Sequence, residues 1–508
     1  MENKDLLKLQ NGSDIRGIAL DGVPGESVNL TQSECLKIGA AFVQWLSKKT
    51  QKSATELTIG IGRDSRLSGP ALEEALVKGM VSEGAKVVRC GMATTPAMFM
   101  SIVFEQTSFV GSVMITASHL PFNRNGVKFF DKDGGLEHDD ITDILEYATK
   151  VDSDKIKDTD ISACEQFNLV KLYAEHLKKT ICKELGTEYS DEAKPLAGLK
   201  FVVDAGNGAG GFFATEILEK LGANISGSQF LEPDGSFPNH IPNPENKEAM
   251  QAIRNATVQN KADLGLIFDT DVDRMSAVLA NGEEVNRDAI IAMVSAILAP
   301  DYPGSTIITD SVTSDRLTYF LEDILGLKHL CYMRGYKNVI NKQKELNAAG
   351  IVSPLAMETS GHGALKDNYY LDDGAFLAVK LVIAVAKAKA NGTTVDSLIA
   401  KLPPLVEEGE YRFKITTEDF KSYGKNVLQE FKARAEKAGY VLPQSFEGVR
   451  ISFKEGDAQG WILLRMSLHD PVMPMNIEGA RKGDLAKLVK IAQELMSGFD
   501  KLDVSCLK

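Results

Sequence analysis

The chain has 508 residues, of which 44% are hydrophobic and 25% are charged, a composition typical of globular proteins. Its length predicts about three to five domains. The formal net charge of −13 disfavours contact with nucleic acid or an anionic membrane, because an acidic surface repels phosphate groups. An anionic small substrate would need a local basic cleft within this surface.

The cysteines and the apolar segments predict a cytoplasmic location. The six cysteines are scattered and form no CxxC pair, which favours reduced thiols over disulfides or a zinc site. The first residues contain no apolar signal segment, and the apolar stretch at 375–388 is interrupted by Lys380 and Lys387. We therefore expect a buried or amphipathic helix at 375–388 and no membrane span.

Hydrophobic periodicity predicts one long helix followed by repeated strand-and-loop units. Thr31 and Glu34 have the spacing of a capping box, and apolar residues recur at helical spacing from Ile38 to Leu46. Short apolar runs then precede polar or glycine-rich turns, a pattern typical of buried parallel strands. These runs lie at residues 57–61, 86–88, 110–115, 201–203, 264–268, 306–309 and 355–356.

The pattern changes after Pro403 and Pro404. Antiparallel strands are expected at 411–415, 449–453 and 461–466, and helices at 420–438 and 484–496. The predicted fold class is therefore α/β, with three similar mixed-sheet α/β domains and a smaller C-terminal α+β domain around a central cleft. We place domains I to IV at residues 1–186, 187–299, 300–406 and 407–508.

An acidic loop directly follows the strand expected at 264–268. Asp269, Asp271 and Asp273 are spaced two residues apart and precede Arg274. If the loop curls, the three carboxylates converge and offer the hard oxygen ligands that magnesium takes. The alternatives are a solvated acidic turn or a calcium loop. An EF-hand is excluded, because the glycine and glutamate that its loop needs are missing.

A second candidate site follows the strand expected at 110–115. Residues 116–121 read Thr-Ala-Ser-His-Leu-Pro, so Ser118 lies on a tight loop ahead of Lys128. A hydroxyl in such a place is suited to act as a nucleophile or a phosphoryl carrier. The competing interpretation is a Ser/Thr-rich turn that satisfies its own backbone.

Three ordered motifs resemble those of the α-D-phosphohexomutase superfamily. They lie at 116–121, at 269–274 and at 357–362, where the chain reads Met-Glu-Thr-Ser-Gly-His. Supporting segments lie at 14–17, 62–66, 95–96, 233–238, 242–245 and 335–337. The resemblance implies an enzyme that moves phosphoryl groups between a serine and a hexose phosphate, with small-molecule hexose phosphates as its partners.

The resemblance also implies a role for each matching residue. The catalytic group would be the phosphorylated serine and its neighbours: Ser118, His119, Arg16, Lys337 and Arg274. One Mg²⁺ per chain would be bound by Ser118, Asp269, Asp271 and Asp273. Substrate hydroxyls and phosphate would be held by Glu358, Ser360, His362, Arg465, Ser467 and His469. A hexose 1,6-bisphosphate would serve as primer or product.

The chain departs from the family pattern in its final loop, at 465–474. Relatives carry Arg-x-Ser-(Gly/Asn)-Thr-Glu-Pro, with an arginine three residues past the proline. This chain keeps Arg465, Ser467 and Pro471, but it has His469 within the loop and Pro474 where the last arginine belongs. In relatives the loop grips the non-reacting phosphate through hydroxyl, backbone and guanidinium donors, so the substitutions change that grip.

Three functions are compatible with these motifs. A phosphoglucomutase/phosphomannomutase-like enzyme is favoured because that activity dominates the superfamily, with glucose ranked before mannose as the sugar. The first alternative is a glucose-1,6-bisphosphate synthase that uses a sugar bisphosphate donor. The second is a catalytically silent sugar-phosphate-binding regulatory protein, which the retention of Ser118 and the aspartates disfavours. The sequence leaves the oligomeric state open.

Overall fold

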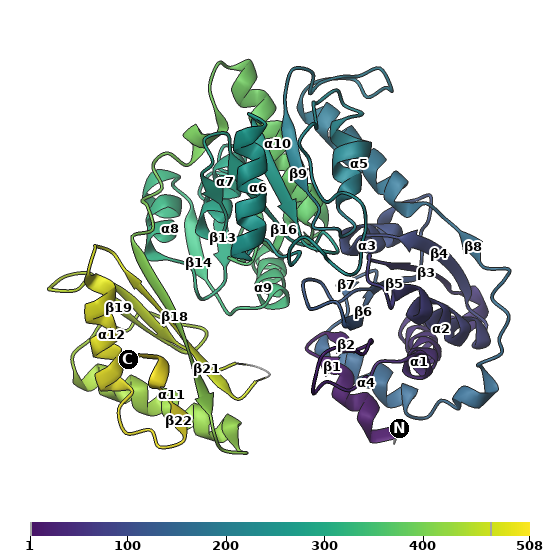
Figure 1. The fold of residues 1–508 in the computed structure, drawn as a ribbon, viewed down its shortest axis with the longest axis horizontal. Coiled ribbons are helices and arrows are strands. Elements are labelled where there is room, and N and C mark those ends of the chain that lie inside the picture. Colours follow the sequence, from purple (N-terminus) through teal and green to yellow (C-terminus); the bar gives the residue numbers. More distant parts are fainter. Residues whose placement is uncertain (1–2, 468–469, 508) are drawn as a thin grey trace. The chain divides into compact units, whose positions relative to one another are not determined.

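A computed structural model describes residues 3–467 and 470–507. The chain divides into two units, unit 1 with residues 1–286, 360–363 and 371–397, and unit 2 with residues 287–359, 364–370 and 398–508. Both units are built from helices packed on β-sheets (Figure 1). No helix in the described ranges combines the length and the apolarity that a membrane crossing requires.

The first long helix, α1 (Gln32–Thr50), begins at the predicted capping box. The side chain of Thr31 accepts a hydrogen bond from the Ser33 backbone at 3.2 Å, and the Glu34 carboxylate accepts one from the Thr31 backbone at 3.0 Å. Helix α1 packs against α2 (Gly69–Ser82) so closely that a Cβ at Gly39 would lie 2.2 Å from the carbonyl oxygen of Leu76. Glycine at this position therefore permits the helix contact.

The first sheet of unit 1 has the order β1-β2-β6-β5-β3-β4-β8, with β7 paired to β6. Strands β5, β3, β4 and β8 are parallel, which confirms the buried parallel strands predicted before residue 116. The strand bounds are β1 Gln10–Asn11, β2 Asp14–Ile18, β3 Thr58–Arg63, β4 Lys86–Met92, β5 Gly111–Ile115, β6 Arg124–Asp131, β7 Gly134–Gly135 and β8 Glu165–Gln166. The helices that follow α2 here are α3 (Thr95–Val103), α4 (His138–Ala148) and α5 (Leu169–Glu184).

Strand β6 was not predicted, because the sequence analysis assigned no strand to the residues around Lys128. This segment instead pairs antiparallel with β5 on one side and with β2 on the other. The pairing explains the strand, because the local sequence carries Asn125 and Gly126 and has no regular alternation of its own. As a result, Lys128 is buried within a sheet.

The second sheet of unit 1 has the order β12-β11-β10-β9. Its strands are β9 Phe201–Asp204, β10 Leu264–Phe268, β11 Met275–Leu279 and β12 Glu284–Val285. Strands β9 and β10 are parallel, whereas β10 and β11 form a hairpin whose connection is the acidic loop. Helix α6 (Lys247–Gln259) and the π-helical turn Phe213–Leu218 accompany this sheet, and α10 (Gly374–Ala390) confirms the helix predicted at 375–388.

Unit 2 contains a parallel group of strands with β13 (Thr306–Thr309) between β14 (Lys328–Cys331) and β15 (Leu355–Met357). Its helices are α7 (Asp288–Leu298), α8 (Asp315–Tyr319) and α9 (Tyr336–Ala348), with a π-helical turn at Phe320–Ile324. Two short strands, β16 (Gly363–Leu365) and β17 (Leu371–Asp372), follow in the sequence. Polar loops follow β13 and β15, as predicted for the ends of buried strands.

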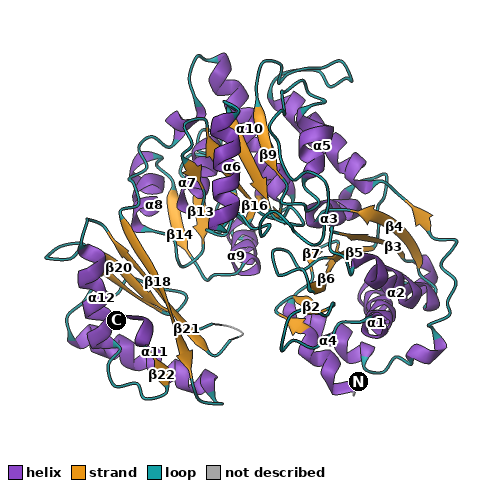
Figure 2. Ribbon diagram, in the orientation of Figure 1, coloured by secondary structure: helices purple, strands orange, loops and turns teal. Residues whose placement is uncertain are grey.

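The last part of unit 2 is an antiparallel sheet of order β19-β20-β21-β18-β22. Its strands are β18 Glu407–Ile415, β19 Val449–Phe453, β20 Gly460–Leu464, β21 Val472–Gly479 and β22 Leu502–Asp503. Helices α11 (Phe420–Lys437) and α12 (Asp484–Leu495) share one hydrophobic core with the sheet (Figure 2). The α/β fold class with a C-terminal α+β region is therefore confirmed.

Candidate active site

Ser118 lies on a strained loop at the carboxyl end of β5. Its φ of 49° falls in the left-handed region, which residues other than glycine seldom adopt. The fully buried guanidinium of Arg66 donates to the backbone carbonyls of Ser118 and Leu120 and, at 2.8 Å, to that of Pro121. A buried arginine therefore holds the loop in this conformation.

The acidic loop after β10 brings three carboxylates together. One oxygen from each of Asp269, Asp271 and Asp273 lies within 4.8 Å of the other two, and all three side chains are buried. Between them, Val272 has a φ of 66°, an outlier for a β-branched residue. Its carbonyl oxygen accepts a hydrogen bond from the backbone of Gly374 at 3.0 Å. The loop thus curls, and a contact from α10 holds the turn.

Ser118 and Asp269 are in direct contact. Ser118 Oγ donates a hydrogen bond to Asp269 Oδ2 at 2.7 Å. Arg274 Nη2 donates to Ser118 Oγ at 2.8 Å, and Arg274 Nε donates to Asp269 Oδ2 at 3.2 Å. The hydroxyl therefore lies between a carboxylate and a guanidinium, and residues 151 positions apart form one polar cluster.

His119 completes this cluster as a neutral imidazole. Its Nδ1 lies 3.4 Å from Ser118 Oγ and accepts a hydrogen bond from Arg274 Nη2. Burial, together with the nearby charges of Arg274 and Arg16, lowers the pKa of His119 to about 2. Arg16 itself, on β2, forms an ion pair with Asp14 at 3.0 Å.

The other two aspartates have different neighbours. Thr95 Oγ1, at the start of α3, donates to Asp271 Oδ2, and Lys128 Nζ lies 3.4 Å from Asp273 Oδ2. Asp271 Oδ1 and Asp273 Oδ1 are buried and accept no hydrogen bond from the described residues. Two anionic oxygens are thus left without donors in the interior, where such groups are costly.

The electrostatics of the three carboxylates reflect their crowding. Burial, with the charge of Asp273 added to it, raises the pKa of Asp269 and raises that of Asp271 to about 6. Burial also acts on Asp273, but the charges of Lys128 and His362 outweigh it and lower the pKa. A hard divalent cation would compensate the unsatisfied oxygens, and a set of carboxylates with one hydroxyl fits such an ion.

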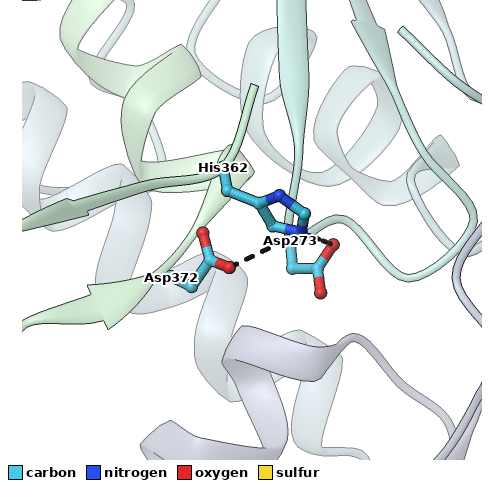
Figure 3. Close-up of side chains that lie close together, drawn as sticks. All are labelled: Asp273, His362 and Asp372. Atoms are coloured by element: carbon cyan, nitrogen blue, oxygen red, sulfur yellow. Dashed lines mark ion pairs between the residues drawn. The ribbon is translucent and has the colours of Figure 1, made fainter. Parts of the chain in front are cut away.

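His362 lies between two carboxylates of unit 1 (Figure 3). Its Nε2 is 3.7 Å from Asp273 Oδ1 and 3.8 Å from Asp372 Oδ2. Its Nδ1 is 2.9 Å from Ser360 Oγ. Two residues of the predicted sugar-binding set therefore lie beside the acidic loop, and Asp372, which the sequence did not single out, supports the ring from the other side.

The remaining candidate residues lie in unit 2. Glu358 Oε1 accepts a hydrogen bond from the backbone of Gly335 at 2.6 Å, so the 335–337 and 357–362 motifs meet. Lys337 lies in the first turn of α9, directly after this glycine. A glutamate on the loop after β15 and a lysine in the first turn of α9 thereby come from two separate motifs into neighbouring segments.

Arg465 and Ser467 lie in the segment that joins β20 to β21. The Arg465 backbone donates to the Pro474 carbonyl at 3.0 Å, and the Ser467 backbone donates to the Val472 carbonyl at 2.9 Å. These contacts extend the hairpin beyond the two strands. His469, expected to hold phosphate, lies outside the described residues.

Three residues that the motif analysis gave no role contribute to the site in unit 1. Arg66 anchors the serine loop, Thr95 binds Asp271, and Lys128 faces Asp273. Arg66 and Thr95 lie in segments that match the superfamily, which was the available signal. Nothing in the local sequence pairs Thr95 with a residue 176 positions away.

Comparison with known proteins agrees with this geometry. Models of the phosphoglucomutase/phosphomannomutase α/β/α domains match residues 8–155 (domain I), 171–282 (domain II) and 286–406 (domain III). A phosphomannomutase/phosphoglucomutase from Pseudomonas putida is 29% identical over 435 residues, which cover 85% of this chain and 86% of the relative. A phosphoglucomutase from Neisseria gonorrhoeae is 28% identical over 480 residues, 94% of each chain.

A solved structure has the same fold. The crystal structure of a phosphoglucomutase/phosphomannomutase family protein from Burkholderia thailandensis superimposes with a TM-score of 0.77 at 25% identity, covering 98% of both chains. Together the three domain models account for most of the chain, including the serine loop and the acidic loop. The chain therefore belongs to the phosphoglucomutase/phosphomannomutase family of the α-D-phosphohexomutase superfamily and is a phosphohexomutase enzyme.

Proposed function

We propose that this phosphohexomutase depends on magnesium and uses Ser118 as its phosphoryl carrier. The observation that carries the proposal is the position of Ser118 Oγ, 2.7 Å from Asp269 Oδ2 and 2.8 Å from Arg274 Nη2. A structural serine in a turn would satisfy its own backbone instead. A hydroxyl between a carboxylate cluster and a guanidinium is placed for phosphoryl exchange, which depends on positioning and charge stabilisation.

The proposed reaction consists of two transfers. In the first, the bond between Ser118 Oγ and phosphorus breaks while a free sugar hydroxyl bonds to phosphorus, and the hydroxyl proton ends on Ser118 Oγ, giving a hexose 1,6-bisphosphate. In the second, Ser118 Oγ bonds to the other phosphorus, the bond from that phosphorus to the sugar oxygen breaks, and the serine proton ends on the released sugar oxygen, so the sugar leaves as the isomeric monophosphate. The enzyme ends phosphorylated, so one bisphosphate molecule primes many turnovers.

The chain's own residues would have separate roles in this reaction. Ser118, Asp269, Asp271 and Asp273 would hold the Mg²⁺, which would offset the charge of about −1.5 to −2 on a phosphoserine. Arg274 would stabilise charge on the transferred group, because its guanidinium already contacts the serine oxygen. His119 is neutral, so it adds no charge and fixes Arg274 by accepting its hydrogen bond.

The substrates would be hexose phosphates, with glucose ranked before mannose. Glu358, Ser360 and His362 would hydrogen-bond sugar hydroxyls that both sugars share, while Arg465, Ser467 and His469 would hold the non-reacting phosphate. Lys337 and Arg16 would complete the positive charge around the reacting groups. All six cysteines are unpaired, which supports a reducing compartment such as the cytoplasm.

One observation favours a second candidate, a glucose-1,6-bisphosphate synthase. Pro474 lies where relatives carry an arginine, and the Pro474 carbonyl serves only to close the hairpin against Arg465. A weaker grip on phosphate would let the bisphosphate escape before its second transfer. The enzyme would then release bisphosphate as its product and would need a second sugar bisphosphate to restore the phosphoserine.

The test begins with the purified chain, glucose 1,6-bisphosphate and Mg²⁺, followed by peptide mass spectrometry. A phosphoryl group on Ser118 is expected. The phosphorylated chain is freed of excess bisphosphate, glucose 1-phosphate is added together with a different sugar bisphosphate as candidate donor, and glucose 6-phosphate and glucose 1,6-bisphosphate are measured together. Fast isomerisation with bisphosphate below the enzyme concentration supports the mutase, whereas bisphosphate that accumulates supports the synthase. An unmodified Ser118 and no turnover of glucose or mannose phosphates would overturn both.

A further inference from the structure

His240 lies between two hydrogen-bond acceptors in the segment before α6. Its Nε2 is 3.1 Å from both carboxylate oxygens of Asp204, at the end of β9, and its Nδ1 is 2.9 Å from the Ile241 carbonyl oxygen. The Asp204 oxygens also accept hydrogen bonds from the Gly206 backbone at 2.9 Å and from Gln229 Nε2 at 2.7 Å, so this group acts as an acceptor. A neutral imidazole has one N–H, whereas two ring nitrogens that both face acceptors require two. His240 is therefore an imidazolium cation.

The imidazolium is buried and has acidic residues beside it on two elements. Asp204 and His240 are both buried, and the Phe230 ring packs edge-to-face against the imidazole with ring centroids 5.3 Å apart. Burial lowers the pKa of His240, but the hydrogen bond and charge of Asp204, the Ile241 carbonyl and the charge of Glu248 in α6 outweigh it. The pKa of His240 therefore lies above its ordinary value of 6.5. The cation persists to a higher pH than it would on an exposed histidine.

The turn after His240 continues to the guanidinium beside Ser118. Asn243 Oδ1 accepts a hydrogen bond from Arg274 Nη1 at 3.4 Å. The Asn243 backbone donates to the Ile241 carbonyl at 2.8 Å, and the same carbonyl faces His240 Nδ1. A single carbonyl group thus joins the imidazolium to the residue that contacts Arg274.

Asn243 supplies the third contact of the Arg274 guanidinium. Its Nε donates to Asp269 at 3.2 Å, and its Nη2 donates to His119 and, at 2.8 Å, to Ser118 Oγ. Because a guanidinium is planar, a contact at Nη1 helps to set the direction in which Nη2 points. The position of the turn that carries Asn243 therefore influences how Arg274 meets the serine oxygen.

We propose that His240 is a positioning residue that aligns Arg274 with Ser118 Oγ. It carries protons on both ring nitrogens and ties the turn that bears Asn243 to Asp204. The proposal rests on the role of Ser118 as phosphoryl carrier described above. When His240 loses a proton, one of its two contacts becomes a pair of facing acceptors, which is unfavourable in the interior. The turn then loosens, and phosphoryl transfer becomes slower although His240 touches no reacting atom.

The test follows a single turnover, the phosphorylation of Ser118 in the dephosphorylated full-length chain by glucose 1,6-bisphosphate and Mg²⁺, over a series of pH values. His240→Gln should slow this transfer about tenfold near neutral pH, with little change in the bisphosphate concentration for half-maximal rate, because Arg274 acts on the transferred group. The wild-type rate should fall as the pH rises through the pKa of His240, and His240→Gln should lack this fall. His138→Gln, at an exposed histidine, is the matched control.

Asn243→Ala provides a second variant, which carries the test if His240→Gln does not fold in urea-unfolding measurements. It should slow the transfer to a similar extent and lose the same pH-dependent fall. The double variant should be no slower than the slower single variant, because both residues act through one contact with Arg274. Asn255→Ala, at an exposed asparagine, is its control.

Two results would overturn the proposal. One is a rate and pH profile of His240→Gln that match the wild type, and the other is a double variant in which the two effects multiply. A wild-type chain in which Ser118 gains no phosphoryl group would instead overturn the carrier role on which the proposal rests.

Discussion

The loop after β10 and the segment after β20 both hold buried charge, but of opposite sign. In unit 1, Asp271 and Asp273 each keep a buried oxygen that accepts no hydrogen bond from the described part of the chain. In unit 2, Arg465 Nε is buried and donates to no acceptor among the described residues, and the Glu447 carboxylate lies 3.8 Å from Nη1. Burying unbalanced charge lowers the stability of the chain alone, so each site is best explained by a ligand of the opposite sign, a cation in one and a phosphate in the other.

The two regions also differ in what surrounds the charge. The acidic loop touches a hydroxyl, because Ser118 Oγ donates to Asp269. Among the described residues, Arg465 instead contacts the Glu447 carboxylate and the Pro474 carbonyl, neither of which is a hydroxyl. Variants of the first region should therefore change the rate of chemistry, and variants of the second should change substrate affinity.

The largest effect is expected for Ser118→Ala. Without the Oγ the chain has no carrier, so kcat for glucose 1-phosphate should fall at least about 10³-fold. The melting temperature should change little, because the loop is held by Arg66 contacts to backbone carbonyls that alanine retains. Ser162→Ala, an exposed serine, is the control. Activity near the wild-type level would contradict the assigned difference between the two regions, since the region around Ser118 would then have no role in the chemical step.

The second-largest effect is expected for Asp271→Asn, which should weaken magnesium activation but raise the stability of the metal-free protein. Loss of one carboxylate should raise the magnesium concentration for half-maximal activity about 10- to 100-fold. In EDTA the same variant should be more stable than the wild type, because one of three mutually repelling buried carboxylates is neutralised. Asp158→Asn, at an exposed aspartate, is the control. An unchanged magnesium titration would contradict the assignment of Asp271 as a ligand.

Much of this architecture follows from local sequence patterns. The capping box of α1, the strand before the acidic loop and the helices of the last region were all readable from periodicity and spacing. Strand β6 was not, because its residues become a strand through pairing with β5 and β2. Segments whose structure is set by distant partners carry little local signal.

The residues of the candidate site were likewise predictable from the sequence only in part. The motifs named Ser118 and the three aspartates because each follows a buried strand, where α/β sheets place ligands. They gave no role to Thr95, whose contact with Asp271 joins residues far apart in the sequence. The burial of Arg465 is likewise a property of the packed chain, since the sequence shows only that an arginine is present.

Thr95→Val tests whether the hydrogen bond from Thr95 orients Asp271 in the acidic loop. Valine has a similar shape but cannot donate to Asp271 Oδ2, so a further carboxylate oxygen loses its partner. The free energy of unfolding should fall by about 1–2 kcal/mol, and magnesium activation should weaken by about 3- to 10-fold. Thr95→Ser keeps the hydroxyl and should retain most of the metal affinity. If serine and valine weaken metal binding equally, the hydrogen bond does not orient Asp271.

Glu478 serves as a reference for the free-energy cost of burying a charge in this fold. Its carboxylate is partly buried at a place where we propose no ligand. It lies on β21, where its carboxylate accepts a hydrogen bond from Ser314 Oγ and lies near Asp288 and Arg316. Burial, with a contribution from Asp288, raises the pKa of Glu478 to about 7 from an ordinary value of 4.5. Between these two values the folded protein binds more protons than the unfolded chain, so the free energy of unfolding falls as the pH rises from about 4.5 to about 7.

Glu478→Gln should remove this part of the pH dependence, since glutamine is neutral throughout. The variant should match the wild type near pH 4 and exceed it by about 2–3 kcal/mol at pH 8, as measured by urea unfolding at a series of pH values. A difference between the two proteins that is independent of pH would show that Glu478 costs nothing when ionised. In that case buried charge would not by itself destabilise this fold, and the unbalanced charges of the acidic loop and of Arg465 would no longer indicate ligands.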